Sequence, residues 1–192
     1  GAIQEAYHVF IKSGLDLFKK QEINILEIGF GTGLNAFITL IEFEKRKLKV
    51  NYTGVEAFPV SVEELDQLNY LEELKSLARK TDFDLMHTSP WGKTVEIVTD
   101  FSLKKEQILF KDISAVAEYD LIYFDAFGAR VQPELWTVEI FQIMFNAMKS
   151  NGYLVTYAAK GSVRRAMQEV GFLVERLPGP PGKREMLRAR KK

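Results

Sequence analysis

Residues 25–35 read ILEIGFGTGLN, and this stretch decides the fold. The apolar, β-branched run before the glycines is typical of a strand that is covered on both faces. Gly29, Gly31 and Gly33 then occupy every second position, and apolar residues recur at helical spacing after them. A strand, a glycine turn and a helix in this order predict a site where a nucleotide-type ligand lies against bare backbone and over the helix N-terminus.

The composition suits a soluble globular protein. The 192 residues, 46% hydrophobic and 27% charged, fit one domain spanning 1–192 with a substantial core. There is no cysteine, which excludes disulfides and cysteine-ligated zinc, and two histidines make a metal site unexpected. No apolar run approaches the roughly 20 residues of a membrane span, and no signal peptide is visible. We therefore expect a cytoplasmic protein with neither a metal nor a membrane partner.

The net charge of zero conceals an uneven distribution. Residues 160–192 carry ten Lys or Arg against three Glu, a net charge of +7, so the first 159 residues carry −7. A basic C-terminal sixth is a candidate surface for a polyanion, although a solvated helix face and a ragged tail would have the same composition.

Strands and helices alternate along the chain. We expect strands at about 23–29, 50–56, 95–100, 119–125 and 153–157, and a closing strand pair near 172–177 and 184–190. We expect helices at about 33–46, from Ser61 onward, at 134–149 and at 161–170, and a loop over 81–93. This order predicts an α/β fold with a doubly wound, Rossmann-like sheet, mostly parallel with an antiparallel C-terminal strand.

Carboxylates end three of the expected strands, at Glu56, Asp100 and Asp125. Ligands of such sheets bind outside the carboxyl ends of the strands, so these side chains should share one rim with the glycine turn. An acidic rim would repel the pyrophosphate of NAD but suits a cationic ligand such as S-adenosylmethionine. The turn itself, G-x-G-x-G preceded by Glu27, also departs from the NAD fingerprint G-x-G-x-x-G.

Several motifs carry a more specific resemblance. The glycine turn looks like motif I of class I S-adenosylmethionine-dependent methyltransferases. The ordered set EAYHVFI (5–11), DAF (125–127), PELWT (133–137) and GKREML (182–187) resembles the methyltransferase half of the MnmC family and its stand-alone relatives. MnmC proteins are bifunctional tRNA 5-methylaminomethyl-2-thiouridine biosynthesis proteins, and the resemblance spans nearly the whole chain. It implies S-adenosylmethionine as cofactor and methyl transfer to the primary amine of an aminomethyl group on the wobble uridine of tRNA.

The resemblance implies a catalytic group formed by Asp125, Phe127 and Trp136. Asp125 would lie beside the acceptor amine and take its proton, or would bind the methionine amine of the cofactor; the sequence leaves both roles open. Phe127 and Trp136 would shape a pocket for an extruded base, with the alternative that Trp136 is a core aromatic.

The cofactor should lie along the rim. We expect the glycine backbone against its methionine and ribose, Glu56 at the ribose hydroxyls and Asp100 at the adenine amine. Glu27 and Asn35 would steady the turn or reach the amino acid of the cofactor, with the alternative that Glu27 only bonds backbone amides. The expected cofactor-binding residues are Glu27, Gly29, Gly31, Gly33, Asn35, Glu56 and Asp100.

Basic residues near the same rim or in the C-terminal sixth are candidates for tRNA phosphates, since such contacts are made mainly by Lys and Arg. They are Arg130, Lys160, Arg164, Arg165, Lys183 and Arg184. Two of them, Lys183 and Arg184, belong to GKREML, whereas Lys191 and Lys192 in the tail are expected to be solvated.

Other functions remain as alternatives. A methyltransferase acting on a protein or small molecule would share the fold, and so would a non-catalytic tRNA-binding relative. An aminopropyltransferase is disfavoured because no second acid follows Asp125. Because no oxidoreductase half follows Lys192, we expect a separate oxidoreductase to supply the aminomethyl substrate. We expect a monomer.

Overall fold

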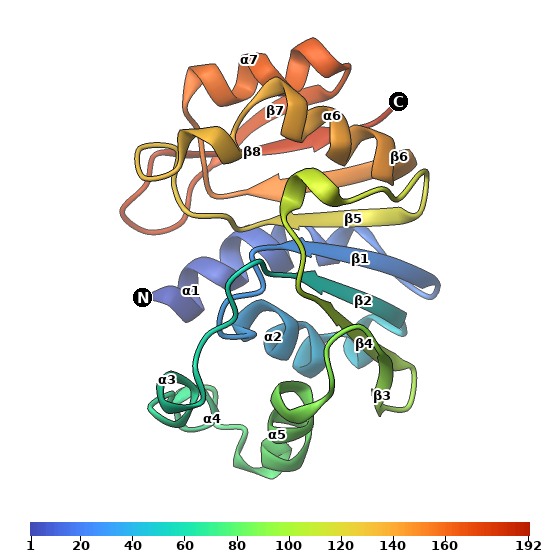
Figure 1. The fold of residues 1–192 in the computed structure, drawn as a ribbon, viewed down its shortest axis with the longest axis vertical. Helices are drawn as coiled ribbons and strands as arrows, with labels where there is room; N and C mark the ends of the chain where they lie inside the picture. Colours follow the sequence, from blue (N-terminus) through green and yellow to red (C-terminus); the bar gives the residue numbers. More distant parts are fainter.

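The computed structural model describes residues 1–192, which form an eight-stranded sheet with helices on both faces (Figure 1). The strands are β1 Glu22–Ile28, β2 Lys49–Val55, β3 Thr94–Val98, β4 Phe101–Glu106, β5 Tyr119–Phe124, β6 Met148–Thr156, β7 Leu173–Pro178 and β8 Glu185–Arg190. Their order is β3-β4-β2-β1-β5-β6-β8-β7. The central strands from β4 to β6 are parallel, and β3, β8 and β7 are antiparallel to their neighbours. The predicted doubly wound sheet with an antiparallel C-terminal strand is confirmed.

The helices are short. The α-helices are α1 Ala2–Ala6, α2 Leu34–Glu42, α3 Val62–Asp66, α4 Tyr70–Glu73, α5 Lys80–Thr88, α6 Val138–Ala147 and α7 Gly161–Val170. The shorter turns are the π-helical η1 Tyr7–Lys12 and the 3-10 turns η2 Leu15–Leu17, η3 Glu44–Arg46, η4 Leu77–Arg79, η5 Phe110–Asp112 and η6 Pro133–Leu135. None of these helices has the length and apolar character needed to cross a bilayer.

Strand β1 explains why the opening stretch is apolar throughout. Ile25 packs in one core cluster with Phe37 of α2, whereas Leu26 packs in the other with Phe141 of α6. Alternate side chains of a strand point to opposite faces, so a central strand covered on both faces needs apolar residues at successive positions. Complete burial of each such side chain contributes about 1.5–3 kcal/mol to stability.

The region after β2 differs from the sequence prediction. Residues 94–106 form a hairpin, in which β3 is antiparallel to β4 and β4 pairs in parallel with β2. Asp100 lies in the hairpin turn with φ +67°, and its carbonyl oxygen accepts from the Val50 N–H at 2.8 Å, at the amino end of β2. The prediction that Asp100 lies on the rim and binds adenine is therefore wrong. Strand β3 is antiparallel to β4, so it ends at the amino ends of the parallel strands and not at their carboxyl ends.

Two further boundaries differ. The loop expected over 81–93 is helix α5 up to Thr88, and it is held by Phe83, whose ring packs edge-on against Phe37 at 5.1 Å. The sequence of α5, KTDFDLMHT, is mostly polar, so the local pattern gave little sign of a helix. The helix expected from Glu134 begins at Val138, where the Thr137 hydroxyl accepts from the Ile140 N–H at 3.4 Å.

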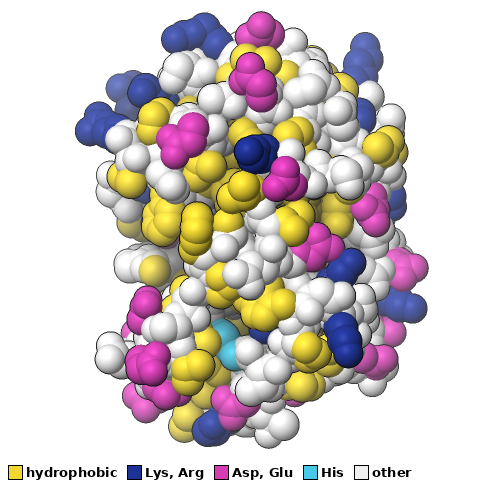
Figure 2. All heavy atoms as spheres, in the orientation of Figure 1, with side chains coloured by type: hydrophobic (Ala, Val, Ile, Leu, Met, Phe, Trp, Pro, Cys, Tyr) yellow, Lys and Arg dark blue, Asp and Glu magenta, His cyan; other side chains and the backbone are white.

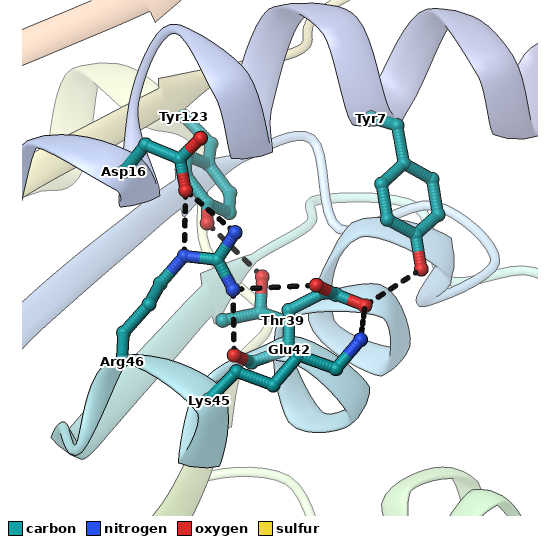
Figure 3. A network of polar contacts seen from close by, with 7 residues as sticks. All are labelled: Tyr7, Asp16, Thr39, Glu42, Lys45, Arg46 and Tyr123. Atoms are coloured by element: carbon teal, nitrogen blue, oxygen red, sulfur yellow. Dashed lines mark hydrogen bonds and ion pairs between the residues drawn. The ribbon is translucent and has the colours of Figure 1, made fainter.

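A polar network joins the N-terminal segment to α2 (Figure 3). The carboxylate of Glu42 accepts hydrogen bonds from the Tyr7 hydroxyl at 3.2 Å, Lys45 Nζ at 3.0 Å and Arg46 Nη1 at 3.2 Å. Arg46 Nε also donates to Asp16 at 2.6 Å. The segment that begins with α1 is thus fixed against the end of α2.

Replacement of Glu42 tests this network. Burial acts to raise the pKa of Glu42, but hydrogen bonds from Lys45 and Arg46 outweigh it and lower the pKa below the usual 4.5. A lowered pKa in the folded state stabilises the protein above the unfolded-state pKa, and this stability is lost as the pH falls through the folded-state pKa. We expect Glu42→Gln to lower the free energy of unfolding by about 1–2 kcal/mol at pH 7. Urea titrations should show a smaller difference at pH 3; an equal difference at both pH values contradicts this account.

Candidate functional site

A cleft of about 930 Å³ opens at the carboxyl ends of the central strands. Its walls come from the glycine turn, α1, the segment after β2 and the β5–α6 connection. In Figure 1 the N-terminus, the β5–α6 connection and the β7–β8 loop lie together at the left of the view. The volume lies within the range of small-molecule sites, about 300–1,000 Å³.

The surroundings of the glycine turn give Gly29 and Gly31 different roles. All have positive φ, +88° at Gly29, +53° at Gly31 and +81° at Gly33, a region that side chains disfavour. A Cβ on Gly29 would lie 2.5 Å from the Asp125 carbonyl oxygen, so Gly29 allows the ends of β1 and β5 to meet. Above Gly31 the space is open, since the nearest atom to an added Cβ is 4.0 Å away. Gly31 therefore presents bare backbone to the cleft.

Glu56 connects the end of β2 to this turn. Its Oε1 accepts from the Gly31 N–H at 2.9 Å, and its Oε2 accepts from the Phe58 N–H at 3.4 Å. Because the second interaction is long, Oε2 keeps capacity for hydroxyl groups of a ligand. Apolar side chains continue the same wall, among them Leu109 and Phe110. A carboxylate followed by an apolar wall suits a ribose and its base.

Beneath the turn, Asn35 joins two carboxyl groups. Its Nδ2 donates to Glu27 Oε2 and to Asp125 Oδ2, each at 2.9 Å. The Tyr52 hydroxyl donates to Glu27 Oε1 at 2.7 Å. Burial raises the pKa of Glu27 well above its usual value, although the hydrogen bond from Tyr52 opposes this. Glu27 is 1% exposed and does not line the cleft.

Asp125 lines the cleft directly after β5. Burial raises its pKa to about 7; the hydrogen bond from Asn35 and the charge of Lys183 act in the opposite direction, whereas the charge of Glu5 raises it further. A carboxyl group with a pKa near neutrality can both accept and release a proton at physiological pH.

Residues from distant parts of the chain border the cleft near Asp125. Lys183 Nζ lies 2.5 Å from Glu5 Oε1 and 4.4 Å from the centre of the Tyr157 ring. The Tyr157 hydroxyl donates to the Ala126 carbonyl oxygen at 2.6 Å. Lys183, expected to contact tRNA, is thus paired with Glu5 beside the site. Sequence reasoning missed Glu5 and Tyr157; only the resemblance of 5–11 pointed to the first.

Trp136 does not line the cleft. It is 5% exposed, and its ring packs edge-on against Phe124 at 4.9 Å. Its Nε1 donates to the Phe127 carbonyl oxygen at 2.7 Å, which fixes the connection that carries Phe127. Phe127 itself is 70% exposed and lines the cleft. The expectation that Trp136 shapes the base pocket is wrong, and it is the core aromatic of the alternative.

The remaining basic candidates lie on one half of the molecule. Arg130 is exposed in the β5–α6 connection, Arg184 is exposed before β8, and three lie at the start of α7, namely Lys160, Arg164 and Arg165. Figure 2 shows Lys and Arg side chains gathered at the upper left and acidic side chains at the lower left, over α3 and α4. A polyanion would be attracted to the α7 half and repelled by the other.

The chain is similar in sequence to known proteins. A sequence model of the family described as "S-adenosyl-L-methionine-dependent methyltransferase" matches residues 83–192. The tRNA 5-methylaminomethyl-2-thiouridine biosynthesis bifunctional protein MnmC of Paracidovorax citrulli is 30% identical over 179 residues, which is 86% of this chain and 27% of that protein. The MnmC protein of Leptospira borgpetersenii is 30% identical over 198 residues, 96% of this chain and 30% of that protein. The chain therefore spans less than a third of the length of these relatives.

Solved structures share the fold. MNMC2 from Aquifex aeolicus superposes with a TM-score of 0.65 at 26% identity, covering 89% of this chain and 54% of that one. Spermidine synthase from Thermotoga maritima superposes with a TM-score of 0.62 at 13% identity, covering 99% and 59%. The second likeness concerns the fold alone.

Proposed function

Because the chain belongs to the S-adenosyl-L-methionine-dependent methyltransferase family, we propose that it methylates the primary amine of an aminomethyl group on the wobble uridine of tRNA. The names of the similar MnmC proteins, which refer to 5-methylaminomethyl-2-thiouridine in tRNA, support this substrate. The observation that carries the proposal is the Asp125 carboxyl, which lines the cleft beside the glycine turn with a pKa raised to about 7. An oxidoreductase activity would supply the aminomethyl group.

The residues of the cleft fit the cofactor. Open space above Gly31 allows the methionine part to approach the backbone, and Oε2 of Glu56 can accept from ribose hydroxyls. Leu109 and Phe110 provide an apolar wall for adenine. No cation of the chain pairs with Glu56, so the site retains the negative charge that suits a sulfonium and an ammonium group.

S-adenosyl-L-methionine, when bound, supplies an electrophilic methyl group on a positively charged sulfur. The chain must hold the acceptor nitrogen in line with that methyl group, and it must take the proton that the nitrogen loses. A protonated amine has no lone pair, so a base is needed near neutral pH. We assign this base to Asp125, which is ionised above its pKa of about 7. Phe127 stands at the mouth of the cleft, where an unstacked base can pack against it.

Nucleoside mass spectrometry tests the proposal. The protein is incubated with S-adenosyl-L-methionine and tRNA bearing 5-aminomethyluridine or its 2-thio form, and tRNA with unmodified wobble uridine is the control. We expect one added methyl group on the modified nucleoside and none on the control. If the cofactor binds but no methyl group is added, the tRNA substrate is wrong, and protein or small-molecule acceptors take its place. Failure to bind the cofactor would favour a non-catalytic relative.

Two arginines of α7 should contact tRNA phosphates. We expect Arg164→Glu with Arg165→Glu to weaken tRNA binding at least tenfold and to reduce the log–log salt slope by about 0.7–0.9 for each phosphate that is no longer neutralised. Lys20→Glu with Lys47→Glu is the matched control, because both lysines are exposed near the amino ends of β1 and β2, away from the cleft. Filter binding over a salt series measures both. An equal loss of affinity in the two double variants would indicate an effect of net charge rather than of direct contact.

A further inference from the structure

Asn35 is fully committed as a hydrogen-bond donor. Its amide nitrogen carries two hydrogens, and the two acceptors at 2.9 Å, Glu27 Oε2 and Asp125 Oδ2, use both. The reverse orientation would direct the amide oxygen at two carboxyl oxygens. The orientation of the amide is therefore set by the two carboxyl groups, and Asn35 in turn fixes the position of the Asp125 carboxyl.

Glu27 is held from its other side by Tyr52 of the neighbouring strand, at 2.7 Å, and it is 1% exposed. No Lys or Arg forms an ion pair with it. A buried carboxylate without a cation is costly, so the neutral acid is the form that this site stabilises. The N–H of Gly31 bonds to Glu56 and not to Glu27, so the predicted support of the turn by Glu27 is absent at Gly31.

We propose that Glu27 is a positioning residue that acts uncharged: through Asn35 it holds the Asp125 carboxyl in place for proton transfer from the acceptor amine. This inference deepens the proposed function and rests on it. As a neutral acid, Glu27 keeps Oε2 as the acceptor for Asn35, and its protonated Oε1 donates to the Tyr52 hydroxyl oxygen, which reverses the direction that this 2.7 Å hydrogen bond has when Glu27 is charged. Cofactor binding then depends on Gly31 and Glu56, and not on Glu27.

Several charged or titratable groups face Asp125. They are Glu5 from α1, Lys183 from the β7–β8 loop, Tyr157 after β6 and, behind Asn35, Glu27 from β1. The hydrogen bond from Asn35 favours the carboxylate form of Asp125. If Glu27 no longer holds Asn35, this bond weakens and Asp125 should titrate at higher pH.

Two substitutions of Glu27 separate hydrogen bonding from charge. In Glu27→Gln the side-chain oxygen can accept from Asn35 while the amide donates to Tyr52, which reproduces the neutral acid. In Glu27→Leu the volume is similar but neither hydrogen bond can form. We expect Glu27→Gln to keep kcat within about threefold and Glu27→Leu to lower it roughly 10–100-fold, the effect typical of an orienting partner. Both should keep the Kd for S-adenosyl-L-methionine within a few-fold.

A titration that needs no tRNA makes the inference independent of the substrate. Carboxyl-¹³C NMR of labelled Asp125, assigned by comparison with Asp125→Asn, should show the same midpoint in wild type and Glu27→Gln and a higher midpoint in Glu27→Leu. If tRNA is not methylated but these titrations hold, the proposed function fails and the positioning role stands.

Other outcomes overturn the inference. A lower midpoint in Glu27→Gln would show that Glu27 was charged. Weaker cofactor binding in both variants would make it a cofactor ligand. An unchanged kcat and midpoint in Glu27→Leu would make it structural. If Glu27→Leu does not fold, Tyr52→Phe replaces it: loss of the hydroxyl should move the midpoint upward while Glu27→Gln leaves it unchanged.

Discussion

Asp125→Ala and Asp125→Asn are expected to lower kcat for methyl transfer by about 10²–10⁴-fold, the usual effect of removing a general base. Affinity for S-adenosyl-L-methionine should change little, because the open backbone at Gly31 and the carboxylate of Glu56 remain. Single-turnover transfer and equilibrium cofactor binding measure the two quantities separately. In the wild type, kcat/KM should rise with pH through about 7, as Asp125 loses its proton.

Asp120→Asn is the control for these variants. Asp120 lies on the same strand but at its amino end, where it accepts from the Asn24 N–H at 2.8 Å. It should leave kcat unchanged. If both Asp125 variants turn over at the wild-type rate, Asp125 is not the base. If they lose affinity for the cofactor, Asp125 is instead the ligand of the methionine amine.

The Asp125 substitution also has a consequence for stability. Its folded-state pKa lies above the unfolded value of 3.8, so its ionisation disfavours the folded state, and stability falls as the pH rises from about 4 through 7. Asp125→Asn cannot ionise and should lose this dependence. The variant is therefore expected to be more stable relative to wild type at pH 8 than at pH 5.

Gly29→Ala should be the most damaging alanine substitution among the three glycines of the turn. An added Cβ would lie 2.5 Å from the Asp125 carbonyl oxygen and 3.0 Å from its carbonyl carbon, and φ is +88°. The left-handed conformation costs about 1–2 kcal/mol for alanine, and overpacking adds about 1–3 kcal/mol. We expect the free energy of unfolding to fall by about 2–5 kcal/mol in urea titrations, with loss of activity as Asp125 is displaced.

Gly31→Ala provides the comparison. Its backbone is also left-handed, with φ +53°, but an added Cβ meets no atom nearer than 4.0 Å. We expect a loss of stability of only about 1–2 kcal/mol together with weaker cofactor binding, since the methyl group enters the cleft. Equal losses of stability in Gly29→Ala and Gly31→Ala would show that the close approach of β1 and β5 is not limiting.

The sequence predicted the parts of the site that follow from strand direction. The glycine turn, Glu56 and Asp125 meet because parallel strands bring their carboxyl ends to one edge. Asp100 was misplaced because the strand predicted at 95–100 was expected to be parallel to β2, and β4 was not predicted. On this side of β2 the parallel partner is β4, which two residues separate from β3. Strand pairing depends on residues far apart in the sequence, so the local alternation of polar and apolar residues does not predict it.

Interactions between residues far apart in the sequence could not be predicted from the sequence pattern either. Lys183 was recognised as basic, but its pairing with Glu5 depends on how the β7–β8 loop lies against α1. Trp136 was recognised as aromatic, and only packing against Phe124 decides that it is buried. Residue type thus identified the groups involved, whereas tertiary packing decided which of them face the cleft.

The pairing of Glu5 with Lys183 has a consequence for how the protein is made. The two residues are 178 positions apart, and a second interaction, between His8 and the Pro178 carbonyl oxygen at 2.8 Å, joins the same two segments. Contacts of such long separation form late, because a large loop must close first. When the glycine turn and Asp125 have been synthesised, Lys183 has not, so its contacts with Glu5 and Tyr157 beside the cleft cannot yet form. Completion of the site is thereby coupled to synthesis of the β7–β8 loop.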